Sequence, residues 1–128
     1  MTELMEKYGG LDYSDHDCFL AVFLTHGGLQ DNKELIYGTD EIGLTKENII
    51  RKFKRNPTLF EKPKIFFFDT CRGANREPTF AKSNNVDENE TFFSQSDFFF
   101  GFSSQRFYVS IATAEGSIYS TFLCNAIN

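Results

Sequence analysis

The sequence predicts an α/β domain in which a mostly parallel sheet is flanked by helices. Three largely apolar segments, at 18–24, 64–68 and 98–102, have the length and aromatic content of buried strands, and in the second of them the apolar residues follow Lys64. A segment with helical periodicity lies between the first two, and strands interleaved with a helix imply parallel crossover connections. The 128 residues are one domain that is long enough to bury a core.

The first predicted elements are a short helix and a buried strand. Residues 2–8 place apolar side chains on one side of a helix, which Gly9 and Gly10 end. Residues 18–24 contain no polar side chain, so we expect a strand that is buried on both faces. The residues Thr-His-Gly-Gly at 25–28 close this strand.

A turn and an amphipathic helix follow. A brief hydrophobic piece at 35–37 runs into a turn at 38–40. Thr45 is suited to cap the next helix, because its hydroxyl can accept a hydrogen bond from a free backbone N–H. The side chains predicted to point inward are Ile49, Ile50 and Phe53.

The second half of the chain is predicted to contain two more buried strands and a final helix. The strands at 64–68 and 98–102 are separated by a polar stretch at 72–97, which is longer than an ordinary loop. Ser117 is a suitable N-cap for the last helix. That helix carries Ile118, Phe122, Leu123 and Ile127.

The composition excludes several classes of function. Asp and Glu number 18 against 13 Lys and Arg, and no basic run occurs, so we expect no nucleic-acid partner. Residues 18–24 are too few to span a bilayer, and the N-terminus carries Glu3 and Glu6 instead of a basic region. We therefore expect no secretion signal and no membrane anchor. Partners are expected to be proteins or small molecules.

The three cysteines predict a reduced, cytoplasmic protein. They form an odd set without metal-binding spacing, so neither a metal nor another cofactor is expected. Cys18 and Cys124 lie in apolar patterns and are predicted to pack in the core. His16, between two aspartates, is predicted to be a solvated loop residue.

Cys71 and His26 are the candidate reactive residues. Each follows a predicted strand within three residues, and the carboxyl ends of parallel strands meet at one rim of a sheet. Thiol proteolysis needs such a pair, because the thiolate attacks and the imidazole transfers the proton. Gly27 and Gly73 would let backbone N–H groups approach a substrate, and the N–H groups of Gly27 and Cys71 are candidates for an oxyanion hole. A small packed cysteine and an ordinary loop histidine remain the alternative.

These residues resemble a known family. Asp-Thr-Cys-Arg-Gly at 69–73 is similar to the Gln-Ala-Cys-Arg-Gly signature of caspases, and Thr-His-Gly at 25–27 to their Ser-His-Gly. His26 lies 45 residues before Cys71, close to the family spacing of about 50. Three further stretches, at 34–41, 96–104 and 116–127, resemble the caspase hairpin after the histidine, the first small-subunit strand and the helix beginning Gly-Ser-Trp-Phe.

The resemblance implies a caspase-like three-layer sandwich, with only part of the full fold present. It also implies a cysteine endopeptidase that acts on protein or peptide substrates through a His26 and Cys71 dyad, with Gly27 and Cys71 as oxyanion donors. Proteolysis and, as an expectation carried over from the family, apoptosis are the implied processes.

Caspases are zymogens that are cleaved between a large and a small subunit. By resemblance, 1–83 is the large-subunit part, 84–97 the intersubunit linker and 98–128 the start of the small-subunit part. Asp87 and Asp97 are the candidate processing sites, and Asp87 is preferred because it lies within Val-Asp-Glu.

The chain departs from the family pattern in the residues that bind an aspartate side chain at P1. Asp69 replaces the signature Gln, and no Arg or Lys occurs at 107–128, where the family has one near Ile111 or Ala112. Arg106 lies too early in the sequence to replace it. The P1 pocket for aspartate is therefore altered or lost. An acidic residue at position 69 resembles metacaspases and paracaspases, which implies cleavage after Arg or Lys.

Three hypotheses follow for the whole chain. The first is a cysteine endopeptidase. The second is a non-catalytic decoy or regulator, a pseudoenzyme that binds a complete caspase, or a second copy of itself, through unpaired strands. The third is a fragment without stable structure, since the family's first strands would precede Met1 and its last elements would follow Asn128.

Overall fold

The computed structural model describes residues 1–75, 97–114 and 116–127. Its helices are α1 (Thr2–Gly9), α2 (Lys46–Lys54), the 3-10 helix η1 (Pro57–Leu59) and α3 (Ile118–Ile127). Its strands are β1 (Phe19–Leu24), β2 (Gly27–Gln30), β3 (Lys33–Tyr37), β4 (Gly43–Thr45), β5 (Lys64–Asp69), β6 (Phe98–Phe102), β7 (Ala112–Thr113) and β8 (Gly116–Ser117).

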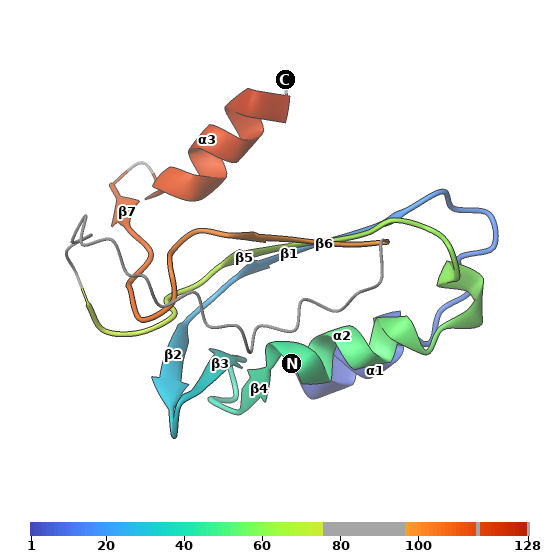
Figure 1. The fold of residues 1–128 in the computed structure, drawn as a ribbon, viewed down its shortest axis with the longest axis horizontal. Helices are drawn as coiled ribbons and strands as arrows, with labels where there is room; N and C mark the ends of the chain where they lie inside the picture. Colours follow the sequence, from blue (N-terminus) through green and yellow to red (C-terminus); the bar gives the residue numbers. More distant parts are fainter. Residues whose placement is uncertain (76–96, 115, 128) are drawn as a thin grey trace, which may run out of the picture.

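The central sheet consists of three parallel strands in the order β1-β5-β6. Phe23 of β1 lies opposite Phe68 of β5, which lies opposite Phe102 of β6. Helices α1 and α2 lie on one side of this sheet and α3 on the other, which gives three layers (Figure 1). The α/β fold and the three parallel neighbouring strands are therefore confirmed.

The core lies between the sheet and the layer of α1 and α2. Phe66 and Phe68 of β5 are fully buried there, and their rings belong to a cluster of stacked and tilted phenylalanines. Helix α2 contributes the predicted stripe of Ile49, Ile50 and Phe53, which is also buried. Each such side chain stabilises the fold by roughly 1.5–3 kcal/mol. The predicted cap is also present, since Thr45 Oγ1 accepts from the N–H of Asn48 at 3.2 Å.

The prediction that the first strand is buried on both faces is wrong. Leu20, Val22 and Leu24 are 53%, 46% and 65% exposed, and they share the face of the sheet opposite to α1 and α2. Among the described residues, α3 reaches this face with Tyr119, which lies over Gly101 and Phe67. The described elements therefore leave the β1 edge of this face open.

The expectation that Cys18 and Cys124 pack in the core is also wrong, because both are exposed. Cys18 directly precedes β1 and lies outside the sheet. Cys124 belongs to α3, which has no buried side chain. His16 is exposed, as predicted.

A second, antiparallel sheet follows β1 and has the order β2-β3-β4. Asp31 and Asn32 connect β2 to β3 with φ values of 49° and 60°. Two positive φ values in a two-residue loop define the tight hairpin turn that asparagine and aspartate tolerate. The stretch at 34–41, which resembles the caspase hairpin, covers β3 and the turn toward β4, with which β3 pairs antiparallel. That hairpin is therefore present, and β3 places Glu34 next to the parallel sheet.

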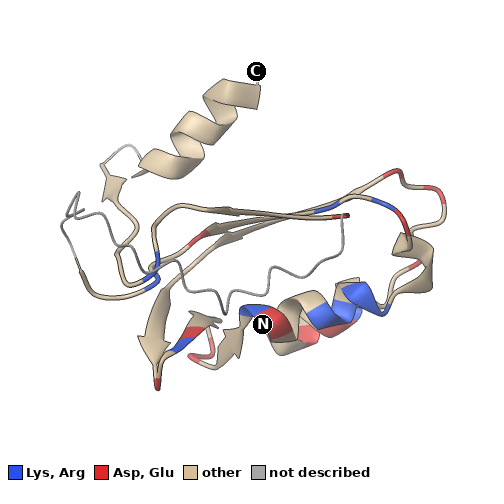
Figure 2. Ribbon diagram, in the orientation of Figure 1, with Lys and Arg blue, Asp and Glu red and all other residues tan. Residues whose placement is uncertain are grey.

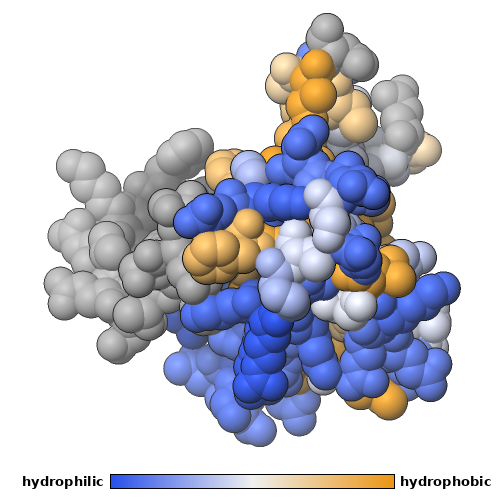
Figure 3. Space-filling view, turned by 90° about the vertical axis from the view of Figure 1, so that its right-hand side faces the viewer, coloured by the Kyte–Doolittle hydropathy of each residue, from blue (hydrophilic) through white to orange (hydrophobic). Residues whose placement is uncertain are grey.

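Charge is distributed unevenly over the molecule. Lys, Arg, Asp and Glu concentrate on α1 and α2, while α3 carries none (Figure 2). The side view in Figure 3 shows the same polarity, with a hydrophilic surface below and apolar side chains at the top over α3. Among the described residues, no helix has the length and apolarity needed to cross a bilayer.

Candidate active site

The last paired residues of β1 and β5 are Leu24 and Asp69, so both strands end at the same rim of the sheet. His26 and Cys71 each follow two residues later. The N–H of Thr25 donates to the carbonyl of Asp69 at 3.4 Å, which keeps the two chain segments side by side beyond the strands.

Gly27 fixes how closely these segments approach. A Cβ atom at this position would overlap the carbonyl oxygen of Cys71 and would lie 3.0 Å from Cβ of Thr70. The backbone on the other side of Gly27 is held by β3, because the N–H of Tyr37 donates to the carbonyl of His26 at 2.9 Å. The chain after β1 is thus clamped between β3 and the residues around Cys71. The His26 side chain is exposed and Cys71 is half-buried.

The segment after Cys71 is held by the loop that follows β6. The N–H of Arg72 donates to the carbonyl of Tyr108 at 2.9 Å, and the N–H of Phe107 donates to the carbonyl of Arg72 at 3.1 Å. A Cβ atom at Gly73 would overlap the backbone of Phe107. The close contact with Phe107 therefore requires a glycine at this position. The approach of a substrate to the Gly73 N–H stays a prediction.

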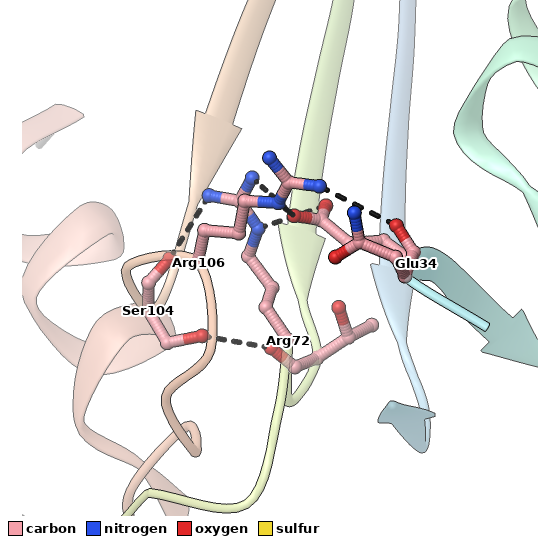
Figure 4. A network of polar contacts seen from close by, with 6 residues as sticks. Glu34, Arg72, Ser104 and Arg106 are labelled. Atoms are coloured by element: carbon pink, nitrogen blue, oxygen red, sulfur yellow. Dashed lines mark hydrogen bonds and ion pairs between the residues drawn. The ribbon is translucent and has the colours of Figure 1, made fainter. Parts of the chain in front are cut away.

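Arg72 anchors the rim through a buried network of polar contacts (Figure 4). Its Nε and Nη2 atoms donate to the two carboxylate oxygens of Glu34, at 3.1 and 2.9 Å, in a two-pronged contact. Its guanidinium also lies 4.3 Å from the centre of the Phe102 ring. Arg106 approaches the same carboxylate from the loop, with Nε 3.2 Å from Oε1 of Glu34. The network joins β3, the segment after β5, β6 and the loop after β6.

Asp69 does not point freely into solvent. The residue is 7% exposed, and its carboxylate accepts hydrogen bonds from the hydroxyls of Ser110, at 2.9 Å, and Ser120, at 2.6 Å. Burial alone raises the pKa of Asp69, but side-chain hydrogen bonds from Ser117, Ser120, Ser110 and Ser103 outweigh burial and hold the pKa below its usual value. The carboxylate is therefore ionised and ties the sheet to α3.

A cavity of about 410 Å³ lies between the loop after β6 and α3. Its lining carries hydroxyls and apolar groups but no charged side chain, and Ser110 belongs to it. Ile111, also in this lining, and Ala112 occupy the positions where an arginine was expected and both are exposed. Arg106 is directed to the hairpin instead, where it also donates to the carbonyl of Asn32 at 3.4 Å.

Of the two candidate processing residues, the structure describes Asp97 alone. Asp87 lies outside the described residues. Asp97 is half-buried beside the start of β6 and forms an ion pair with Lys64 of β5. Among the described residues, no group of three or more histidine, cysteine or acidic side chains could hold a metal ion.

Sequence reasoning missed three residues of this region. Glu34 directly precedes the short hydrophobic piece at 35–37, Lys64 begins the predicted strand at 64–68, and Ser120 belongs to a helix that was predicted from its apolar residues. A charge at the beginning of a strand that is otherwise buried could have indicated Lys64, because buried charges are usually paired.

The fold and this rim together define the class of the protein: an α/β domain with a thiol and an imidazole beyond the carboxyl ends of neighbouring parallel strands. A family model for the caspase domain matches residues 1–128, and the chain belongs to the caspase family.

Two caspases and one solved caspase structure that resemble the chain are longer than it is. Caspase-10 of Homo sapiens is 33% identical over 124 residues, which cover 88% of this chain and 23% of that protein. Caspase-6 of Gallus gallus is 31% identical over 134 residues, which cover 91% of this chain and 42% of that protein. The crystal structure of Caspase-1 from Spodoptera frugiperda matches with a TM-score of 0.76 and 27% identity over 98% of this chain and 48% of that chain. The chain thus spans less than half the length of each.

Proposed function

We propose that the chain is the catalytic part of a cysteine endopeptidase of the caspase family, with Cys71 as the nucleophile and His26 as its proton-transfer partner. One observation carries the proposal: Gly27 packs on the carbonyl of Cys71, so the backbones that carry the imidazole and the thiol touch at one rim. Family membership supports the same assignment.

The proposed reaction is acyl transfer to sulfur. The Cys71 thiolate attacks the scissile carbonyl carbon, and the N–H groups of Gly27 and Cys71 are the proposed donors to the oxyanion. His26 protonates the leaving amine, which leaves a thioester on Cys71. Water, deprotonated by His26, then hydrolyses the thioester and restores the thiol.

Labelling with a thiol-reactive peptide electrophile tests this assignment. Cys18 and Cys124 are exposed and Cys71 is half-buried. A reagent whose rate depends only on the accessibility of the thiol should therefore modify Cys18 and Cys124 first. Selective modification of Cys71, lost in His26→Ala, supports the dyad. Modification of Cys18 and Cys124 at rates equal to that of Cys71, unchanged by His26→Ala, would contradict it.

The P1 preference is proposed to be basic. The ionised carboxylate of Asp69 accepts a hydrogen bond from Ser110, which lines the cavity, and the cavity lining offers no cation to hold a P1 carboxylate. A like-charge contact would disfavour aspartate, and an opposite charge would favour arginine or lysine.

A second candidate function is a decoy that binds a complete caspase. The open apolar face with Leu20, Val22 and Leu24 favours this function, because large exposed apolar patches often mark interaction sites. Pull-down with a complete caspase tests it: binding that survives Cys71→Ala and is lost in Val22→Lys supports the decoy. Labelling of Cys71 without any such binding supports the enzyme.

A further inference from the structure

Lys64 and Asp97 join the two parts of the chain that the polar stretch at 72–97 separates. Lys64 is the first residue of β5, and Asp97 directly precedes β6. The Lys64 ammonium is 3% exposed, so it cannot exchange its partners for water, while the Asp97 carboxylate is 26% exposed.

The surroundings of the ammonium are complete. Its three donors match three oxygens: the carbonyl of Leu59 at 2.7 Å, the carbonyl of Lys62 at 2.8 Å and a carboxylate oxygen of Asp97. The backbone N–H of Lys64 also donates to the carbonyl of Asp97, at 2.7 Å. Of the three oxygens around the ammonium, the Asp97 carboxylate is the charged one, and it alone comes from the other side of the polar stretch.

We propose that Lys64 and Asp97 form a clamp that keeps β6 in the sheet when the chain is cut between Asn75 and Asp97. A cut before Asp97 leaves the carboxylate attached to β6, so the clamp bridges the two fragments. A cut after Asp97 leaves both partners on the β5 fragment, and no clamp then holds β6. Of the two candidate processing residues, a cut after Asp87 should therefore give a stable product and a cut after Asp97 should not.

The clamp also affects the rim that carries Cys71, because the loop that supports this rim directly follows β6. Ser103 and Ser104, directly after β6, donate hydroxyls to the carbonyl of Thr70, next to Cys71. Loss of β6 would remove these contacts. The proposal rests on the proposed function in one respect: it assumes that the chain is cut in this stretch. The experiment below measures whether the β6 fragment stays bound, and this binding does not depend on peptide hydrolysis.

The test uses the full chain with a recognition sequence for a site-specific protease inserted between residues 90 and 91. After cutting, size-exclusion chromatography and native mass spectrometry measure how much of the β6 fragment remains with the β5 fragment. We expect retention in the parent and at least about a hundredfold weaker association in Asp97→Ala, because that change leaves a buried ammonium unpaired. Lys64→Met should weaken retention less, because the Asp97 carboxylate can reach water. Equal retention in the parent and in Asp97→Ala would overturn the proposal.

A second measurement covers the case in which the cut variant does not fold. Hydrogen exchange of the uncut Asp97→Ala chain should rise at the β6 amides and remain near parent values in α2. An unchanged rate at β6, or an equal rise in α2, would contradict a local clamp. Asp40→Asn is the matched control, since Asp40 is exposed and pairs with the N-terminus at 3.4 Å; it should leave both readouts unchanged.

Discussion

The α-carbon of Gly27 faces the backbone carbonyl of Cys71 so closely that no Cβ atom fits between them. This contact joins the segments that carry the proposed imidazole and the proposed thiol. It also explains why a glycine is required directly after His26.

Replacing Gly27 by alanine should separate the two segments. We expect Gly27→Ala to lower the free energy of unfolding by about 1–3 kcal/mol, because the methyl group overlaps backbone and not a flexible side chain. Chemical denaturation measures this loss. Gly28→Ala is the control: its methyl group would lie 3.6 Å from the Tyr37 ring, an ordinary contact. Equal stability of the two variants would contradict the close approach.

Cys71→Ala should abolish peptide hydrolysis, because the nucleophilic sulfur is lost. Cys124→Ala should leave both hydrolysis and stability nearly unchanged, within about 0.5 kcal/mol, since Cys124 is exposed on α3. Assays with fluorogenic peptides and thermal unfolding separate these effects. If Cys71→Ala hydrolysed peptides at the parent rate, Cys71 could not be the nucleophile.

Asp69 should make the protein less stable in acid. Hydrogen bonds from serine hydroxyls outweigh burial and lower the pKa of Asp69 below its ordinary value of 3.8. Its contribution is therefore present above pH 3.8 and is lost as the pH falls through the folded-state pKa. Denaturation midpoints between neutral pH and about pH 2 should fall less steeply in Asp69→Asn than in the parent. If the midpoints of the parent and of Asp69→Asn changed with pH in parallel, Asp69 would not contribute to the loss of stability in acid.

The same carboxylate should set the P1 preference. A peptide library that varies at P1 should be cleaved better after Arg or Lys than after Asp, because the ionised Asp69 disfavours a negative side chain. Asp69→Gln removes the charge and should reduce the preference for basic residues. Cleavage after Asp in the parent, with no response to Asp69→Gln, would contradict this prediction.

The Glu34 carboxylate should be important for stability. Glu34→Gln removes the negative charge that the guanidinium groups of Arg72 and Arg106 both contact, so we expect the free energy of unfolding to fall by about 3–5 kcal/mol in urea denaturation. Glu6→Gln is the matched control, because Glu6 pairs with Lys52 on the surface, where both side chains are largely exposed. That change should cost at most about 1 kcal/mol. Similar losses in both variants would show that the network around Arg72 stabilises the fold no more than a surface ion pair does.

The sequence alone was enough to predict the three parallel strands, helix α2 and the turn at 38–40. These features depend on local patterns: apolar runs, helical periodicity, a capping threonine and turn residues. Because parallel strands end at a common rim, the positions of His26 and Cys71 along the chain also predicted that they lie at one edge of the sheet.

Other features became visible only in the tertiary structure. An apolar run such as that of β1 does not reveal whether one face or both will be covered, because coverage depends on elements elsewhere in the chain. The same is true of polar partners. Lys64 meets Asp97 from 33 positions away, Arg72 meets Glu34 from 38, and Asp69 meets Ser120 from 51. Sequence periodicity reports which way a side chain points from its own element, whereas burial and pairing depend on which distant side chain the fold places against it.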